Sequence, residues 1–143
     1  MNKIILILSV FLFLSCKQKK TVDDLRQAVR IADVSQVEEL LKNKELYNQS
    51  LLKDLAGISI RKNHNFKIVK LLCENGLPVN SNARFIDGSF IYESSLLSNA
   101  LIYENDDFVT YLLDHNVDLN IRINSYNNAF EYSLSKLKGK YFC

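Results

Sequence analysis

The chain has 143 residues, of which 48% are hydrophobic and 24% are charged, and this length and composition fit one globular domain with its own core. The chain has 18 basic and 16 acidic residues, so it lacks the strong positive charge that nucleic-acid-binding domains carry. One proline and four glycines argue against a disordered chain.

Residues 1–16 have the pattern of a secretory signal peptide. Lys3 precedes an apolar run over residues 4–14, and Ser15 and Cys16 follow this run. Such a run is too short to span a hydrocarbon core of roughly 30 Å as a helix. A charged start, a short apolar middle and a small residue before the cleavage point are typical of a signal. We therefore expect residues 1–15 to be removed.

The cysteine at the end of this signal resembles the lipidated cysteine of a bacterial lipobox. In that motif the cysteine is diacylated and becomes the new N-terminus, although Phe13 stands here where Leu, Val or Ile is usual. A lipid on Cys16 would anchor the chain by burying acyl methylenes at about 0.8 kcal/mol each, with residues 16–20 as a polar tether. We expect a lipid-anchored protein on the periplasmic side of the bacterial cell membrane, and Lys17 is compatible with the outer membrane. The alternative is an ordinary signal followed by an unrelated cysteine.

Two later segments, residues 25–43 and 97–115, repeat one spacing of apolar residues. In each, an apolar stripe with helical spacing is followed by a polar break and a second stripe. The stripes consist of Leu25, Ala28 and Val29, then Val37, Leu40 and Leu41, and of Leu97, Ala100 and Leu101, then Val109, Leu112 and Leu113. We expect Asp33 or Ser35 in the first break, and residues 105–107 in the second, to cap the helix that follows.

The ends of two predicted helices have nearly the same sequence, "IVKLLCENGLPVN" and "FVTYLLDHNVDLN". Gly76 and Asn116 are the residues in them that most readily adopt the left-handed conformation that ends a helix. We expect Val79 and Leu119 then to pack under the preceding helix.

Residues 81–93, "SNARFIDGSFIYE", have the pattern of a β-hairpin. Asp87 and Gly88 suit a two-residue type I′ turn, and aromatic and branched residues on both sides favour strands. Residues 121–128 resemble a second hairpin with its tip at residues 124–125.

These patterns together resemble the ankyrin repeat, in which Leu-x-x-Ala-Ala, a turn and Val-x-x-Leu-Leu are followed by Gly-Ala-Asp-Val-Asn. The resemblance implies an all-α repeat solenoid, a stack of about three to four helix-turn-helix repeats with β-hairpin fingers. It divides the chain into repeats at about 21–48, 49–80 and 94–120, a partial repeat at 127–143 and a long finger at 81–93. The second repeat fits least well, because the first helix of "SLLKDLAGISIRKNHNF" is about one turn too long. A tetratricopeptide-like array is the alternative, but it would need neither the hairpins nor the Gly-x-x-Val-Asn segments.

Residues for catalysis or metal binding are sparse. His64 and His115 have no Cys or His at ligand spacing, and no phosphate loop, serine elbow or Cys–His arrangement is present. Cys73 lies in an apolar stripe, where free cysteine behaves as a small hydrophobe, and we do not expect it to pair with Cys143. The sequence therefore predicts no enzymatic activity, no metal, no cofactor and no small-molecule substrate.

The ankyrin resemblance implies protein binding through the finger tips and the exposed face of each first helix, where aromatic residues and arginine dominate interface energies. The candidate residues are Arg84, Phe85, Asp87, Phe90 and Tyr92 in the first hairpin, Arg122, Asn124 and Tyr126 in the second, and Arg26, Arg30, Ser98, Ile102 and Tyr103 on the helices. For Phe85, Phe90 and Tyr92 the alternative is packing within the hairpin and on the next repeat.

The predicted function is thus a membrane-anchored module that binds another protein at the bacterial cell envelope. Two alternatives stay open: an immunity or protective protein that neutralises a toxin or stabilises an envelope enzyme, and an envelope hydrolase.

Overall fold

A computed structural model describes residues 21–121, 128, 131–132 and 135, and its helices follow one another in pairs. The pairs are α2 (Val22–Arg30) with α3 (Val34–Leu41), α4 (Gln49–Asn63) with α5 (Phe66–Glu74), and α6 (Leu96–Ile102) with α7 (Asp106–Asp114). A short 3-10 helix, η1 (Lys44–Leu46), precedes α4, and the strands β1 (Asn82–Asp87) and β2 (Phe90–Ser95) separate α5 from α6.

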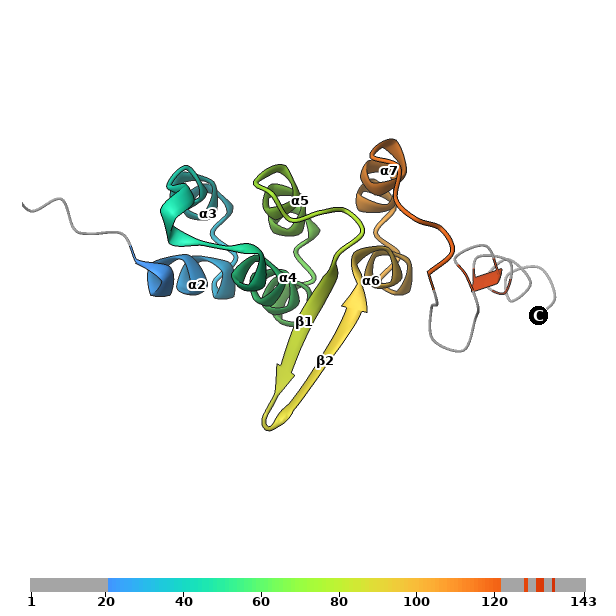
Figure 1. The fold of residues 1–143 in the computed structure, drawn as a ribbon, viewed down its shortest axis with the longest axis horizontal. Helices are drawn as coiled ribbons and strands as arrows, with labels where there is room; N and C mark the ends of the chain where they lie inside the picture. The colour runs from blue at the N-terminus through green and yellow to red at the C-terminus, as the bar shows by residue number, and fades with distance from the viewer. Residues whose placement is uncertain (1–20, 122–127, 129–130, 133–134, 136–143) are drawn as a thin grey trace, which may run out of the picture.

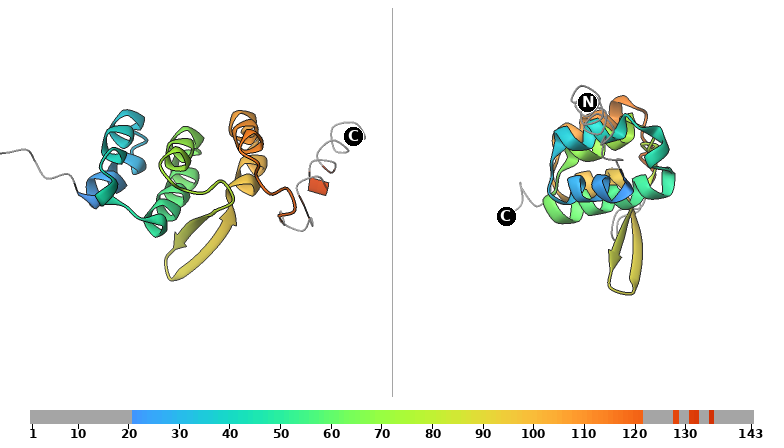
Figure 2. Two further views of the ribbon diagram at one scale, coloured as in Figure 1. Left: turned by 45° about the horizontal axis from the view of Figure 1, so that its top comes forward. Right: turned by 90° about the vertical axis from the view of Figure 1, so that its left-hand side faces the viewer.

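The helices lie in two rows, one made of α2, α4 and α6 and the other of α3, α5 and α7 (Figure 1). Each helix packs on the other member of its pair, and α3, α5 and α7 also pack on one another in that order. A view along the long axis shows the two rows as two layers, with the hairpin leaving the α2–α4–α6 layer on the side away from the other layer (Figure 2). The segments around Leu40, Leu72 and Leu112 therefore lie in equivalent places, side by side.

Each α-helix begins at a polar residue whose side chain accepts a hydrogen bond from a backbone amide of the first turn. These N-cap residues are Thr21, Asp33, Asn48, Asn65, Ser95 and Asn105. Thr21 and Asp24 also form a capping box, in which the Asp24 carboxylate accepts from the Thr21 amide at 2.7 Å. The predicted caps at Asp33 and Asn105 are confirmed.

The predicted apolar stripes lie largely in the core. Nine of their twelve residues are buried, namely Leu25, Ala28, Val29, Val37, Leu40, Leu41, Leu97, Ala100 and Leu112. Leu101 and Val109 are partly buried, but the prediction is wrong for Leu113, which is 49% exposed. Successive residues lie about 100° apart around a helix, so Leu113 points away from the core that its neighbour Leu112 enters.

The two predicted helix stops have the predicted backbone. Gly76 has a φ of 110° and Asn116 a φ of 56°, both in the left-handed region. The next residues, Leu77 and Val117, donate their amides to carbonyls of the last helical turn and are buried. Helices α5 and α7 thus both end at a residue with left-handed backbone, followed by a buried apolar residue whose amide bonds back to the helix.

The residues beyond these stops only partly follow the prediction. Val79 is partly buried against the core, whereas Leu119 is 47% exposed, so the predicted packing of Leu119 is wrong. The Asn80 side chain accepts a hydrogen bond from the Asp118 amide at 2.7 Å and so joins the two equivalent segments.

The predicted first hairpin is present, but its turn is shifted by one residue. β1 and β2 pair antiparallel from Asn82 opposite Ser95 to Asp87 opposite Phe90, which leaves Gly88 and Ser89 as the turn. Of these two, only Gly88 has a positive φ, 59°, which fits a turn of type II′ rather than the predicted type I′. The second predicted hairpin, apart from its first and last residues, lies outside the described part of the chain.

The predicted fold class, an all-α repeat solenoid, is wrong. In the described residues, six α-helices combine with a two-stranded antiparallel sheet in a small mixed α/β domain. The sheet belongs to the core, because β1 lies along α4 and its Ala83 and Phe85 are 0% and 5% exposed. The prediction treated the whole hairpin as a projecting finger, since strand alternation alone does not tell which half of a hairpin packs on a helix.

The predicted signal peptide and Cys16 lie outside the described residues, as does most of the partial repeat at 127–143. Within the described ranges, none of the helices has the length and apolar character needed to cross a bilayer.

Candidate binding surface

The base of the hairpin is held on α4 by Arg84. Its Nη1 donates to Asp54 Oδ1 at 3.2 Å and to Ser50 Oγ at 3.0 Å, both on α4, and its Nε donates to Glu93 Oε1 on β2 at 3.0 Å. The hydrogen bond from Arg84 lowers the pKa of the Glu93 carboxyl, and the same bond is the main reason that the pKa of Arg84 is raised. One arginine thus ties both strands to the helix.

The outer half of β1 is held by a second arginine. Arg61 donates from Nη1 to the carbonyl oxygen of Ile86 at 2.7 Å and from Nη2 to Asp87 Oδ1 at 3.0 Å. Arg61 lies in the last turn of α4, which has 15 residues where α2 has 9 and α6 has 7. The predicted extra length of this helix is confirmed, and it carries the side chain that supports the hairpin.

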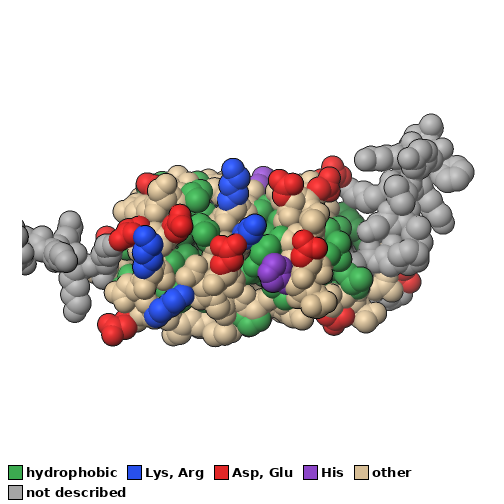
Figure 3. All heavy atoms as spheres, turned by 90° about the horizontal axis from the view of Figure 1, so that it is seen from above, with side chains coloured by type: hydrophobic (Ala, Val, Ile, Leu, Met, Phe, Trp, Pro, Cys, Tyr) green, Lys and Arg blue, Asp and Glu red, His purple; other side chains and the backbone are tan. Residues whose placement is uncertain are grey.

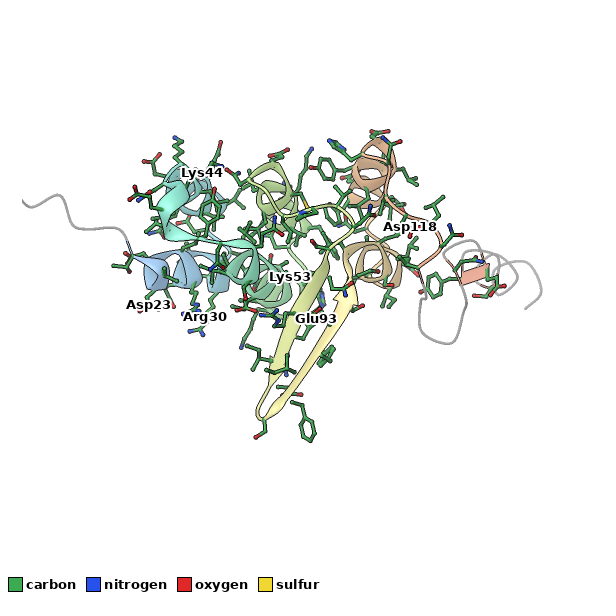
Figure 4. All side chains as sticks on the ribbon, viewed as in Figure 1. Asp23, Arg30, Lys44, Lys53, Glu93 and Asp118 are labelled. Atoms are coloured by element: carbon green, nitrogen blue, oxygen red, sulfur yellow. The ribbon has the colours of Figure 1, made fainter. Side chains whose placement is uncertain are left out.

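The free end of the hairpin exposes four apolar side chains, which we call the hairpin tip. Ile86, Phe90, Ile91 and Tyr92 are 56%, 79%, 66% and 52% exposed. Beneath them the ring of Phe85 stacks on that of Tyr92, with centroids 4.9 Å apart and planes 9° from parallel. The hairpin extends well beyond the helices, and the side chains near its turn point into solvent (Figure 4).

Two adjoining hollows of about 430 and 530 Å³ lie between β1 and the helices α2 and α4. They share Arg30, Asp54, Ile58 and Ile86. The first is completed by Gly57, Arg61, Lys62, Arg84, Phe85 and Asp87, and the second by Asp23, Asp24, Arg26 and Gln27. We call this depression the corner groove. Arg30 projects from α2 on the same side of the helix row as the hairpin (Figure 4).

The face formed by α3, α5 and α7 has a different character. Charged side chains of both signs lie there among apolar ones (Figure 3). Tyr103 lies at the C-terminal end of α6, where its ring is 4.3 Å from that of His64. Tyr103 is not among the residues that line the corner groove.

The structure brings together part of the predicted site. Arg26, Arg30, Arg84 and Asp87 line the corner groove, and Phe90 and Tyr92 belong to the hairpin tip. Phe85 is buried and follows the packing alternative, and Ser98 is 4% exposed, so the interpretation of Ser98 as a surface contact is wrong. Ile102 is partly buried. Arg122, Asn124, Tyr126 and Cys16 lie outside the described residues.

Sequence reasoning missed the part of the surface that α4 supplies. These residues are Asp54, Gly57, Ile58, Arg61 and Lys62, together with Ile91 at the tip. The extra turn of α4 could have indicated these residues. The last turn of a helix that is longer than its neighbours cannot pack on them, so it contacts another part of the chain. Among the described residues, no cluster of three or more His, Cys, Asp or Glu could hold a metal ion.

Neither a protein-family model nor a curated protein matches this chain. The resemblance to ankyrin repeats therefore stays a prediction from the sequence pattern.

Proposed function

We propose that this chain is a non-catalytic protein-binding module, held at the bacterial cell envelope by a lipid on Cys16. The observation that carries the proposal is the hairpin tip, where four exposed apolar side chains project beside the corner groove, Ile86 and Ile91 from one face of the hairpin and Phe90 and Tyr92 from the other. Burying apolar surface is favourable by about 25 cal/mol for each Å² removed from water, and groups of exposed apolar side chains often mark interaction sites. Phe90 and Tyr92 are of the residue types that anchor protein interfaces.

The way the hairpin is held favours binding. A flexible hairpin loses conformational entropy when it binds a partner, whereas a hairpin that is already fixed by contacts within the free protein loses less. Arg84 links both strands to α4, and Arg61 holds β1 further out. The tip is therefore presented in one orientation before a partner arrives.

The chemistry of the corner groove supports binding rather than catalysis. No His, Cys or Ser is among its lining residues, so it contains no Ser–His or Cys–His pair. Asp54 and Asp87, the carboxylates of its inner hollow, are both engaged with arginines. These ion pairs hold the hairpin in place.

Site-specific photo-crosslinking in cells that produce the full chain tests the binding proposal. A photoreactive amino acid at Ile91 is expected to yield a covalent adduct with a partner protein. The same amino acid at Glu38, an exposed residue of α3 on the other row, is the matched control and should yield none. Adducts of equal intensity from both positions, or none from Ile91, would contradict the proposed surface.

The anchor is tested separately by cell fractionation. The wild-type chain is expected in the membrane fraction and Cys16→Ser in the soluble fraction, because the lipid requires the cysteine thiol. Cys73→Ser is the control and should leave the distribution unchanged. Membrane association that persists in Cys16→Ser would contradict lipidation but would leave the binding surface untouched.

A further inference from the structure

We propose that the corner groove binds an extended acidic segment of the partner protein, in which carboxylates are flanked by apolar side chains. This inference rests on the proposed function, because it names the chemistry of the partner at the same surface. Its basis is an excess of positive charge in the inner hollow of the groove.

The inner hollow of the groove is lined by six charged side chains, and four of them are already paired. Arg61 pairs with Asp87 at 3.0 Å and Arg84 with Asp54 at 3.2 Å. The remaining two, Arg30 and Lys62, form no ion pair with any other described residue. Both are cations, so the hollow retains two positive charges with free hydrogen-bond donors.

These two cations come from the adjacent ends of neighbouring helices. Arg30 lies in the last turn of α2 and Lys62 in the last turn of α4. The Asn63 side chain joins the helix ends by donating to the Arg30 carbonyl at 3.2 Å. Cations at these positions interact favourably with the negative end of the helix dipole, which accounts for their location but leaves their side-chain donors unused.

The wall beside the cations is apolar. Ile58, which is partly buried, and Ile86, which is 56% exposed, line both hollows. A bound segment that covers them would also exclude water from the cations, and a charge pair is stronger where water is excluded. A complementary segment therefore needs carboxylates for Arg30 and Lys62 and apolar side chains for the isoleucines.

The shape of the groove favours an extended segment over a single small ion. The two hollows adjoin through shared residues and continue along α2 from its C-terminal to its N-terminal end. Asp23 and Asp24 lie at the far end, where Asp23 pairs with Arg26 at 3.6 Å. The unpaired positive charge is thus confined to the end nearest the hairpin, which defines where the carboxylates of the segment bind.

Fluorescence anisotropy of the full chain, purified in a mild detergent, tests the inference. The probes are three short labelled peptides that keep the same apolar residues and carry Glu, Gln or Lys at the remaining positions. The groove variant is Arg30→Gln with Lys62→Gln. The control of equal charge change, outside the groove, is Lys67→Gln on α5 with Lys42→Gln at the C-cap of α3, where Lys42 pairs with Glu39. We expect the Glu peptide to bind most tightly. Binding should be roughly tenfold weaker in the groove variant, which loses two charge pairs with the peptide, and unchanged in the control.

Several outcomes would overturn the inference. Equal binding of the Glu and Gln peptides would show that the charges do not select the segment, and equal loss in both double variants would show an effect of net charge alone. Binding of phosphatidylglycerol vesicles through Arg30 and Lys62, with no binding of the Glu peptide, would replace the acidic segment with a lipid surface. In each of these cases a partner adduct from Ile91 would leave the proposed function standing, whereas the absence of that adduct would count against the function itself.

Discussion

The carbonyl oxygen of Arg84 occupies the space that a side chain on Gly57 would need, since a β-carbon there would lie 1.8 Å from that oxygen. Helix α4 and strand β1 are therefore in backbone contact at this point. The contact places Arg84 beside Asp54, one turn earlier on the helix, and brings Arg61, one turn later, to the outer half of β1. A missing side chain and two arginines together orient the hairpin that carries the candidate binding surface.

Gly57→Ala is expected to destabilise the protein by on the order of 3 kcal/mol, because the added methyl group must displace the backbone of β1. The direction of this change in stability is informative, because replacing glycine by alanine in a helix interior otherwise stabilises the helix by roughly 0.5–1 kcal/mol. Urea unfolding followed by circular dichroism measures the change. Lys62→Ala, at an exposed position of the same helix, is the control and should change the free energy of unfolding by no more than about 0.5 kcal/mol. A stabilised Gly57→Ala variant would contradict the backbone contact.

Stability should fall in acid partly through Glu93. Its pKa is lowered in the folded protein by the hydrogen bond from Arg84, so the folded state releases this proton more readily than the unfolded state. The stabilisation is complete above the ordinary carboxyl pKa of 4.5 and is lost as the pH falls through the lowered value. Urea midpoints between about pH 6 and pH 3 should decline more steeply for the wild type than for Glu93→Gln. Parallel declines would show that the Arg84–Glu93 pair contributes nothing to the pH dependence.

The left-handed stop after α7 predicts opposite responses to two substitutions. Asn116 has a φ of 56°, which alanine adopts poorly and glycine readily. Asn116→Ala should lower the free energy of unfolding by about 1 kcal/mol, and Asn116→Gly should leave it within about 0.5 kcal/mol of the wild type. Thermal or urea unfolding of the pair distinguishes backbone strain from loss of the side chain, because the side chain is removed in both variants.

The Cys73 thiol should react slowly in the folded protein. Burial raises its pKa to about 12, and nearby Glu74 adds to the effect, so very little reactive thiolate exists at pH 8. Alkylation by iodoacetamide, followed at this residue by peptide mapping, should be far slower than alkylation of free cysteine and should accelerate in urea. Native labelling at the rate of free cysteine would mean that Cys73 lies in water.

Some features of the site could be predicted from the sequence, and others could not. The hairpin and the long first helix of the second pair were indicated by local patterns, and Arg30 and Arg84 were named because of the resemblance to ankyrin repeats. The position of the turn was missed by one residue, because Asp-Gly and Gly-Ser both suit two-residue turns and the pairing of the strands decides between them. The contribution of Arg61 and Lys62 was missed, since a basic helix end is as well explained by the helix dipole as by a neighbouring strand.

Local sequence specifies the helices, their polar caps, their left-handed stops and the existence of a hairpin, since each of these depends on residues only a few positions apart. Packing in three dimensions places the inner half of the hairpin in the core, which makes the domain a mixed α/β one. It also decided that Arg61 meets Asp87 and that Arg84 meets Asp54, pairs separated by 26 and 30 residues. Such contacts depend on how α4 and β1 cross, and that crossing is set by the close packing of two backbones at Gly57, which local sequence preference does not encode.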